Sequence, residues 1–66
     1  MNLKKLRKKL GYTQRNVADA VGIARESYTN IENRVRHPSV PVAKRLGEVL
    51  GFDWSELFEN DVSKED

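Results

Sequence analysis

A change of helical phase at one glycine constrains this chain more than any other feature. Apolar residues recur at helical spacing on both sides of Gly22 in the stretch QRNVADAVGIARESYTNIE, residues 14–32, but the phase of the repeat changes across that glycine. The stretch therefore predicts two short helices that meet at an angle. Gly22 can take the positive φ of a sharp turn, and Ala18 leaves room for the second helix to cross the first. We expect a helix-turn-helix here.

Polar side chains at the start of the second of these helices indicate a ligand with hydrogen-bonding edges. A helix-turn-helix presents its second helix to the DNA major groove, and that helix is expected here over about residues 25–33. Arg25 can bind guanine O6 and N7, Asn30 can pair with adenine, and Glu26 can accept from cytosine N4 or aim Arg25. Thr29 can meet a thymine methyl group or a phosphate. The alternative is that these residues form an ordinary polar helix face.

Charge is unevenly distributed along the chain. The 66 residues carry a net charge of +2, but residues 1–45 carry +8 and residues 46–66 carry −6. This asymmetry favours a basic face for a polyanion and an acidic end that is directed elsewhere, although ordinary solvated helix faces would produce it too.

A single domain of this size buries only about 60% of its unfolded surface, so pairing with a second copy would add stability.

Several kinds of function lack the residues that they need. The absence of cysteine excludes disulfides, thiolate zinc sites and thiol nucleophiles, and His37 is the only histidine, so no metal or cofactor is expected. No catalytic constellation is recognisable, and we expect that the protein is not an enzyme. No apolar run approaches the roughly 20 residues of a membrane span. These features predict a soluble, cytoplasmic protein without a membrane partner or an evident small-molecule ligand.

The first ten residues predict an amphipathic helix over residues 2–10. Asn2 can cap its start and Gly11 ends it. Arg7 lies at the edge of the apolar stripe, so we expect it to be the cation of this helix that has a fixed partner. The stripe consists of Leu3, Leu6 and Leu10.

A second group of polar residues suits the phosphate backbone of DNA. Thr13 is a predicted N-cap, and Gln14 then lies beside a helix N-terminus, where N–H groups and the helix dipole attract phosphate. The helix expected over about residues 25–33 is called the recognition helix below. Arg34 and Arg36 follow its end and supply two cations. The predicted phosphate-binding set comprises Gln14, Arg15, Asn33, Arg34, Arg36 and Lys44.

A fourth helix is expected after Ser39, which can act as its N-cap, with Pro41 tolerated in the first turn. Gly47 is expected to permit a close helix crossing, and Gly51 ends the helix. The predicted inner face consists of Val40, Ala43, Leu46, Gly47 and Leu50.

Asp53 and Glu56 predict a capping box for a last helix over residues 54–58. The large apolar residues around it exceed what one short helix needs for its core contacts, so part of them is expected to form a dimer interface. These residues are Phe52, Trp54, Leu57 and Phe58. We expect a helix-turn-helix DNA-binding domain over residues 1–60, followed by an acidic, disordered tail over residues 61–66.

Five fragments in this order resemble the small Xre-type regulators related to the lambdoid phage repressors and Cro proteins. The fragments are LKKLRKKLGYTQ, VADAVGI, YTNIEN, the HPS turn and GFDWSELF, and together they cover about residues 2–58. The resemblance implies an all-α, compact five-helix bundle of the lambda-repressor-like class. It also implies that the protein binds double-stranded DNA as a two-fold homodimer and controls transcription.

The resemblance also implies roles for individual residues. Arg7 and Glu32 match a buried ion pair that orients the third helix, and removing one partner of such a pair costs about 3–5 kcal/mol. Gln14 matches a phosphate contact. The base-reading positions of the family match Arg25, Glu26 and Asn30, and the family dimer interface lies in the C-terminal region.

Two residues depart from the family pattern. Ala24 replaces the usual Ser or Thr before the third helix, so that helix lacks a side-chain cap that contributes about 1 kcal/mol. Arg34 stands where a glycine commonly follows the asparagine, and we therefore expect Asn33 to take any left-handed conformation at the helix end.

Together these features predict a sequence-specific DNA-binding regulator, a repressor that binds a palindromic operator with half-sites roughly 34 Å apart. The alternative is a protein-interaction module, such as an antitoxin or a phage accessory protein, whose third helix binds a protein. A salt titration separates the two, because affinity for DNA falls steeply as phosphate counterions are displaced.

Overall fold

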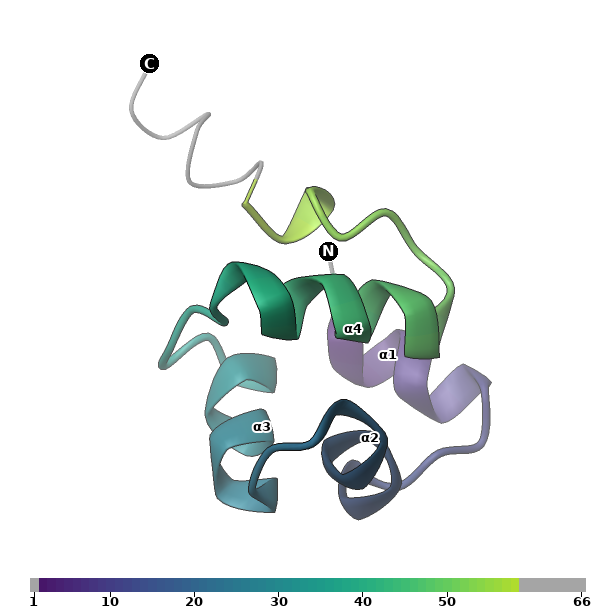
Figure 1. The fold of residues 1–66 in the computed structure, drawn as a ribbon. Coiled ribbons are helices and arrows are strands. Elements are labelled where there is room, and N and C mark those ends of the chain that lie inside the picture. The colour runs from purple at the N-terminus through teal and green to yellow at the C-terminus, as the bar shows by residue number, and fades with distance from the viewer. Residues whose placement is uncertain (1, 59–66) are drawn as a thin grey trace.

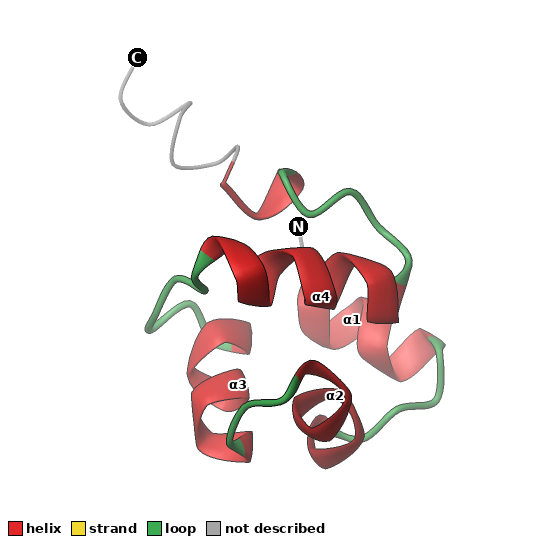
Figure 2. Cartoon of the chain, in the orientation of Figure 1, coloured by secondary structure: helices red, strands yellow, loops and turns green. Residues whose placement is uncertain are grey.

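The computed structural model describes residues 2–58, so the tail predicted over residues 61–66 lies outside the described residues. Figure 1 shows four helices, which are α1 (Leu3–Lys9), α2 (Gln14–Val21), α3 (Arg25–Glu32) and α4 (Val40–Leu50). A fifth helical turn covers residues 56–58, and no strand occurs among residues 2–58 (Figure 2). The predicted all-α five-helix bundle is confirmed.

Three of the four helices begin at the side-chain caps that the sequence predicts. Asn2 Oδ1 accepts the backbone N–H of Lys5 at 3.0 Å, and Ser39 Oγ accepts that of Val42 at 3.4 Å. At α2 the bonds are reciprocal, because Thr13 Oγ1 accepts from Asn16 N and Asn16 Oδ1 accepts from Thr13 N, both at 3.0 Å. These bonds satisfy N–H groups that a helix leaves open in its first turn.

The bend between α2 and α3 lies at the predicted glycine. Gly22 has a φ of 87°, in the left-handed region. The Ala18 carbonyl accepts the N–H groups of Gly22 at 2.8 Å and Ile23 at 3.0 Å, which closes the end of α2. Ala18 is fully buried, and α2 packs against both α3 and α4. The turn thus sets the angle at which α3 leaves the core.

The core lies between the helices and is built mainly from Val, Leu and Tyr side chains. Its largest fully buried side chains are Tyr28, Leu46 and Val17. Two predicted core positions are wrong, because Leu10 is 46% exposed and Val40 is 47% exposed. Helix α1 ends at Lys9, so Leu10 lies beyond the helical stripe, while Val40 is the first residue of α4 and lies outside its buried face.

Gly47 permits a close approach, but the approaching segment is not a crossing helix as predicted. A Cβ atom at Gly47 would lie 2.6 Å from the Phe52 carbonyl oxygen and 3.2 Å from Trp54 Cβ. The chain therefore folds back onto α4 immediately after the helix ends. Asp53 caps the returning turn, since its Oδ1 accepts the backbone N–H of Ser55 at 3.0 Å and the Ser55 hydroxyl at 2.9 Å.

Candidate nucleic-acid interface

The four predicted base-reading residues all lie on α3, outside the core. Arg25 and Glu26 at its start are exposed, whereas Thr29 and Asn30 in the following turn are half-buried. Helix α3 buries Tyr28 on its inner side. The helix therefore presents a polar edge whose donors and acceptors match those of base edges in the major groove.

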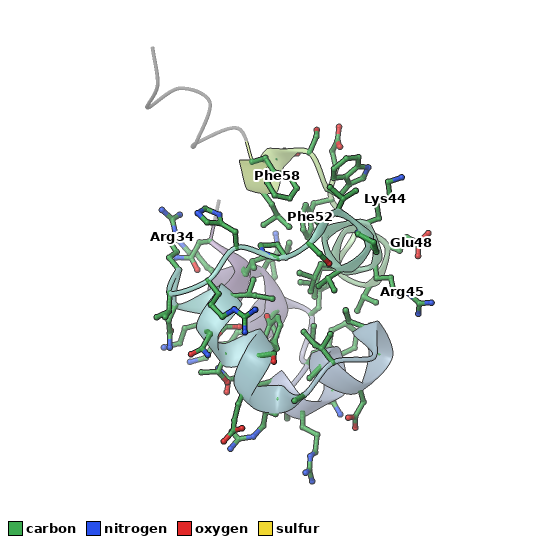
Figure 3. The ribbon with its side chains drawn as sticks, turned by 60° about the vertical axis from the view of Figure 1, so that its left-hand side comes forward. Arg34, Lys44, Arg45, Glu48, Phe52 and Phe58 are labelled. Carbon is green, nitrogen blue, oxygen red and sulfur yellow. The ribbon has the colours of Figure 1, made fainter. Side chains whose placement is uncertain are left out.

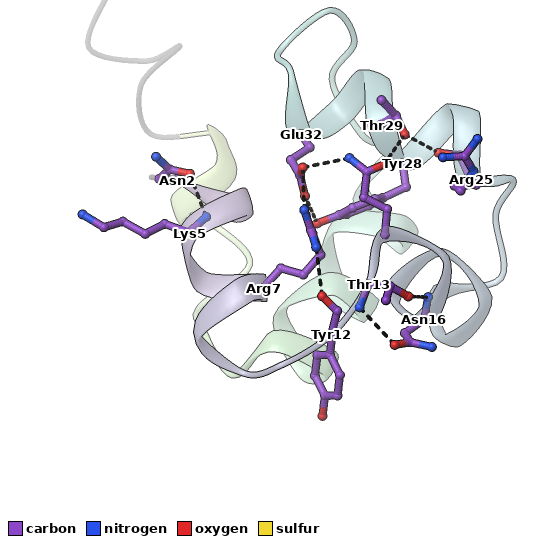
Figure 4. Close-up of polar contacts among 11 residues, drawn as sticks. Asn2, Lys5, Arg7, Tyr12, Thr13, Asn16, Arg25, Tyr28, Thr29 and Glu32 are labelled. Atoms are coloured by element: carbon purple, nitrogen blue, oxygen red, sulfur yellow. Dashed lines mark hydrogen bonds and ion pairs between the residues drawn. The ribbon is translucent and has the colours of Figure 1, made fainter.

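A buried ion pair joins α1 to the end of α3, as the resemblance implies. Arg7 Nε donates to Glu32 Oε2 at 2.8 Å and Arg7 Nη2 donates to Glu32 Oε1 at 3.2 Å (Figure 4). The side chains are 8% and 1% exposed, respectively. Arg7 Nη1 also donates to the Tyr12 carbonyl at 2.9 Å, so the same guanidinium holds the turn between α1 and α2.

Glu32 accepts two further hydrogen bonds that the sequence analysis missed. The Tyr28 hydroxyl donates to Glu32 Oε2 at 2.7 Å, and Gln14 Nε2 donates to Glu32 Oε1 at 3.0 Å. Tyr28 and Glu32 are four residues apart, and residues at this spacing are neighbours on a helix surface, so the sequence could have predicted this contact. The contact with Gln14 bridges two helices and has no local signal.

These contacts shift the pKa values of the groups that make them. Burial raises the pKa of Glu32, but hydrogen bonds from Arg7, Tyr28 and Gln14 together lower it to about 2. The hydrogen bond to Glu32 raises the pKa of Arg7 above its ordinary value. Burial, with the hydrogen bond to Glu32, also raises the pKa of Tyr28. The ionised carboxylate and the cation are therefore maintained throughout the neutral range.

Gln14 also contacts Thr29, which links the start of α2 to the middle of α3. The Thr29 hydroxyl lies 3.1 Å from Gln14 Oε1 and 2.9 Å from the Arg25 carbonyl oxygen, and both are acceptors. From the sequence, Gln14 is predicted to contact phosphate and Thr29 is predicted to contact a base or a phosphate. The structure brings the two side chains together within the protein.

The end of α3 differs from the prediction for Asn33. Asn33 has a φ of −86°, and Arg34 takes the left-handed conformation instead, with a φ of 64°. The Arg34 N–H donates to the Ile31 carbonyl at 3.1 Å and the Val35 N–H donates to the Asn30 carbonyl at 2.8 Å. This is the Schellman pattern, in which the left-handed residue follows the C-cap. Arg34 therefore occupies the glycine position itself.

Among the predicted phosphate-binding residues, Lys44 lies apart from the others. Its Nζ lies 5.4 Å from the centre of the Trp54 ring, a cation–π distance. Figure 3 shows Lys44 on the side of the molecule away from Arg34. Arg15, Asn33 and Arg36 are exposed near the ends of α2 and α3, and Gln14 is half-buried at the start of α2.

The four predicted dimer-interface residues are all half-buried, and two of them contact the core while the other two contact each other. Phe52 and Leu57 pack against the core. The rings of Trp54 and Phe58 lie 6.0 Å apart at an angle of 79°, an edge-to-face contact.

Within residues 2–58 no group of three or more His, Cys, Asp or Glu side chains is arranged to hold a metal ion. In the same part of the chain, every helix is too short or too polar to cross a membrane.

Comparison with known proteins identifies the family to which this chain belongs. The family model described as Helix-turn-helix matches residues 3–57. The chain is 56% identical over 58 residues to "Uncharacterized HTH-type transcriptional regulator YqaF" of Bacillus subtilis (strain 168), an alignment that covers 88% of this chain and 76% of that protein. It is 33% identical over 63 residues to "Uncharacterized HTH-type transcriptional regulator YqaE" of the same organism, covering 96% of this chain and 54% of that protein. No solved structure matches the chain.

Proposed function

The chain belongs to the Cro/C1-type, Xre-like helix-turn-helix family of DNA-binding transcriptional regulators, and from that premise we propose that it represses transcription by binding a palindromic operator as a homodimer. The observation that carries the proposal is the polar edge of α3. Arg25 and Glu26 are exposed there, while the Arg7–Glu32 ion pair fixes the other end of the helix beneath the surface.

The base-reading role belongs to the polar side chains along the outer edge of α3. Arg25 binds guanine through two parallel N–H groups, and Asn30 binds adenine N6 and N7. Glu26 accepts from cytosine N4 or orients Arg25, and its negative charge weakens binding to DNA that lacks the correct base. The edge thus favours discrimination between sites over tight binding to any DNA.

Phosphate contacts come from the start of α2 and from the segment that follows α3. Gln14 and Arg15 lie at the start of α2, and Asn33, Arg34 and Arg36 lie at the end of α3 and in the loop that follows. Phosphate contacts at these positions set the register of the recognition helix in the groove. Lys44 is left out of this set because of its contact with Trp54.

The homodimer forms through the C-terminal surface around Trp54 and Phe58, and the protein acts in the cytoplasm without a cofactor. Two copies related by a two-fold axis place their recognition helices in successive major grooves, roughly 34 Å apart. Dimer formation also compensates for the small core of a 66-residue chain.

Selection of bound oligonucleotides from a random pool tests the proposal, since it predicts a two-fold symmetric consensus. On the selected site, Arg25→Ala and Asn30→Ala each cost about 1–3 kcal/mol of binding free energy but have little effect on random DNA. Arg36→Ala weakens both complexes alike, since it contacts phosphate. The matched control is Arg45→Ala, an exposed position on α4, which leaves both affinities unchanged.

A salt titration of the wild-type complex decides between DNA and a protein ligand. The logarithm of the DNA affinity should fall with the logarithm of the salt concentration, by about 0.9 for each phosphate contact. Failure to enrich any sequence, together with a flat salt dependence, would favour the protein-interaction module.

A further inference from the structure

The carboxamide of Gln14 is held from two sides by residues of α3. Its Nε2 donates to Glu32 Oε1 at 3.0 Å, and its Oε1 lies 3.1 Å from the Thr29 hydroxyl oxygen. Gln14 is the first residue of α2, so both contacts cross from one helix of the motif to the other. Gln14 is half-buried and lies beside the N–H groups that a helix leaves open at its start.

The chemistry of Glu32 determines the orientation of this amide. An ionised carboxylate only accepts hydrogen bonds, so the NH₂ end of Gln14 must face it. The carbonyl end of Gln14 then faces Thr29, which must act as the donor. A hydroxyl has one proton, and the Thr29 hydroxyl already has two acceptors within the protein, Gln14 Oε1 and the Arg25 carbonyl oxygen. Thr29 therefore has no proton left for a phosphate oxygen, which can only accept.

We propose that Thr29 is a positioning residue that acts through Gln14. Its hydroxyl and the Glu32 carboxylate hold the Gln14 carboxamide so that one Nε2–H is bound internally and the second is left to donate to a DNA phosphate. This inference rests on the proposed function, because it assigns how one phosphate contact is prepared before DNA arrives. A donor that is oriented in the free protein loses less rotamer freedom on binding.

Two substitutions separate the hydroxyl of Thr29 from its methyl group. Thr29→Val keeps the shape and removes the hydroxyl, whereas Thr29→Ser keeps the hydroxyl and removes the methyl group. We expect Thr29→Val to lower affinity about twofold to tenfold, the range of one hydrogen bond, on the selected site and on random DNA alike. The slope of the salt dependence should stay close to that of the wild type, because an uncharged amide neutralises no phosphate and releases no counterion. Thr29→Ser should leave affinity and slope close to those of the wild type.

A double-mutant cycle with Gln14→Ala tests whether the effect passes through Gln14. In the Gln14→Ala background, Thr29→Val should cause no further loss, because the side chain that it orients is missing. An equal loss in both backgrounds would overturn the proposal. So would a loss from Thr29→Val on the selected site alone, since that pattern identifies Thr29 as a base-reading residue.

A measurement without DNA separates this inference from the proposed function. In a ¹⁵N–¹H NMR spectrum of the free protein, Thr29→Val should shift the side-chain NH₂ signals of Gln14 and speed their hydrogen exchange, whereas Thr29→Ser should not. Melting curves of each variant establish that it is folded, and Thr29→Ala replaces the valine variant if valine lowers the melting temperature. Unchanged Gln14 signals in a folded variant without the hydroxyl would overturn the positioning role even if the wild type binds DNA.

Discussion

At the scale of single residues, Glu32 connects three helices of the bundle. Its carboxylate accepts from Arg7 of α1, Gln14 of α2 and Tyr28 of α3. Its side chain is 1% exposed, and a charge so deeply buried is tolerated only because its lone pairs are satisfied. The same carboxylate thus fixes the end of the recognition helix and the amide at the start of α2.

The stability of the protein should depend on the ionisation of Glu32. The folded protein lowers the pKa of this group from 4.5 to about 2, so folding favours the ionised form. The ionised Glu32 therefore adds on the order of 3 kcal/mol to the free energy of unfolding. This contribution is present above a pH of about 4.5 and is lost as the pH falls towards 2. Urea denaturation between pH 2 and pH 7 measures the loss.

NMR titration of the side-chain carboxyl carbons assigns this effect to a residue. The Glu32 signal should titrate near pH 2, and the control Glu48→Gln, at an exposed position of α4, should leave that signal unchanged. A Glu32 midpoint near 4.5 would contradict the prediction.

At the scale of elements, α3 is stabilised by its surroundings more than by its own ends. Ala24 gives its start no side-chain cap, and Arg34 places a side chain in the left-handed region at its end. The helix has only eight residues, too few to be stable alone in water. Its order depends on burial of Tyr28 and on the bonds to Glu32. The polar edge of α3 is therefore held in place by tertiary contacts.

Arg34→Gly should raise the stability of the protein by about 1 kcal/mol, because glycine adopts the left-handed conformation without the Cβ clash. Thermal or urea denaturation measures the change. The same substitution should weaken DNA binding, since it removes a proposed phosphate contact. Arg36→Gly is the matched control, and it should not stabilise, because Arg36 is not among the residues with positive φ. Equal stability changes in the two variants would argue against strain at Arg34.

Gly47→Ala should destabilise the protein by about 1–3 kcal/mol, the usual cost of overpacking. The new Cβ would lie 2.6 Å from the Phe52 carbonyl oxygen, so the returning segment must move away from α4. Trp54 is the only tryptophan, and its fluorescence should shift to longer wavelength as it becomes more exposed. Arg45→Ala, at an exposed position of α4, should leave the spectrum unchanged, and an unchanged spectrum for Gly47→Ala would show that the turn does not depend on this contact.

At the scale of the whole molecule, the two ends of the chain carry opposite charge. The +8 of residues 1–45 includes the cations around α2 and α3, and the −6 of residues 46–66 lies in the C-terminal third. The aromatic residues of the dimer proposal belong to the acidic part of the chain.

Trp54→Ala should shift the sedimentation profile towards the monomer, because truncation of a large aromatic residue in an interface removes much of its buried area. Analytical ultracentrifugation over a range of protein concentrations measures the shift. Tyr12→Ala removes a 41% exposed aromatic side chain from the turn between α1 and α2 and serves as the control. If the Trp54 variant sediments as the wild type does, Trp54 lies outside the interface.

Local chemistry was sufficient to predict much of this protein from its sequence. The caps at Asn2, Thr13 and Ser39 and the turn at Gly22 depend on residues close together in the chain, and their preferences are intrinsic to the backbone. The helical repeat predicted that Val17, Tyr28 and Leu46 would be buried. The helix-turn-helix follows from these local rules, and the family comparison agrees with it.

Contacts between distant segments decided the rest. The position of the left-handed residue depends on where α3 ends, and the approach to Gly47 depends on the path of the chain after α4. The bonds of Gln14 with Glu32 and Thr29 join residues that are 18 and 15 positions apart. Periodicity specifies which face of a helix is buried but not which polar atoms meet across two helices. Residue types and local turns were therefore readable from the chain, whereas the partners of its polar side chains were determined only when the helices packed.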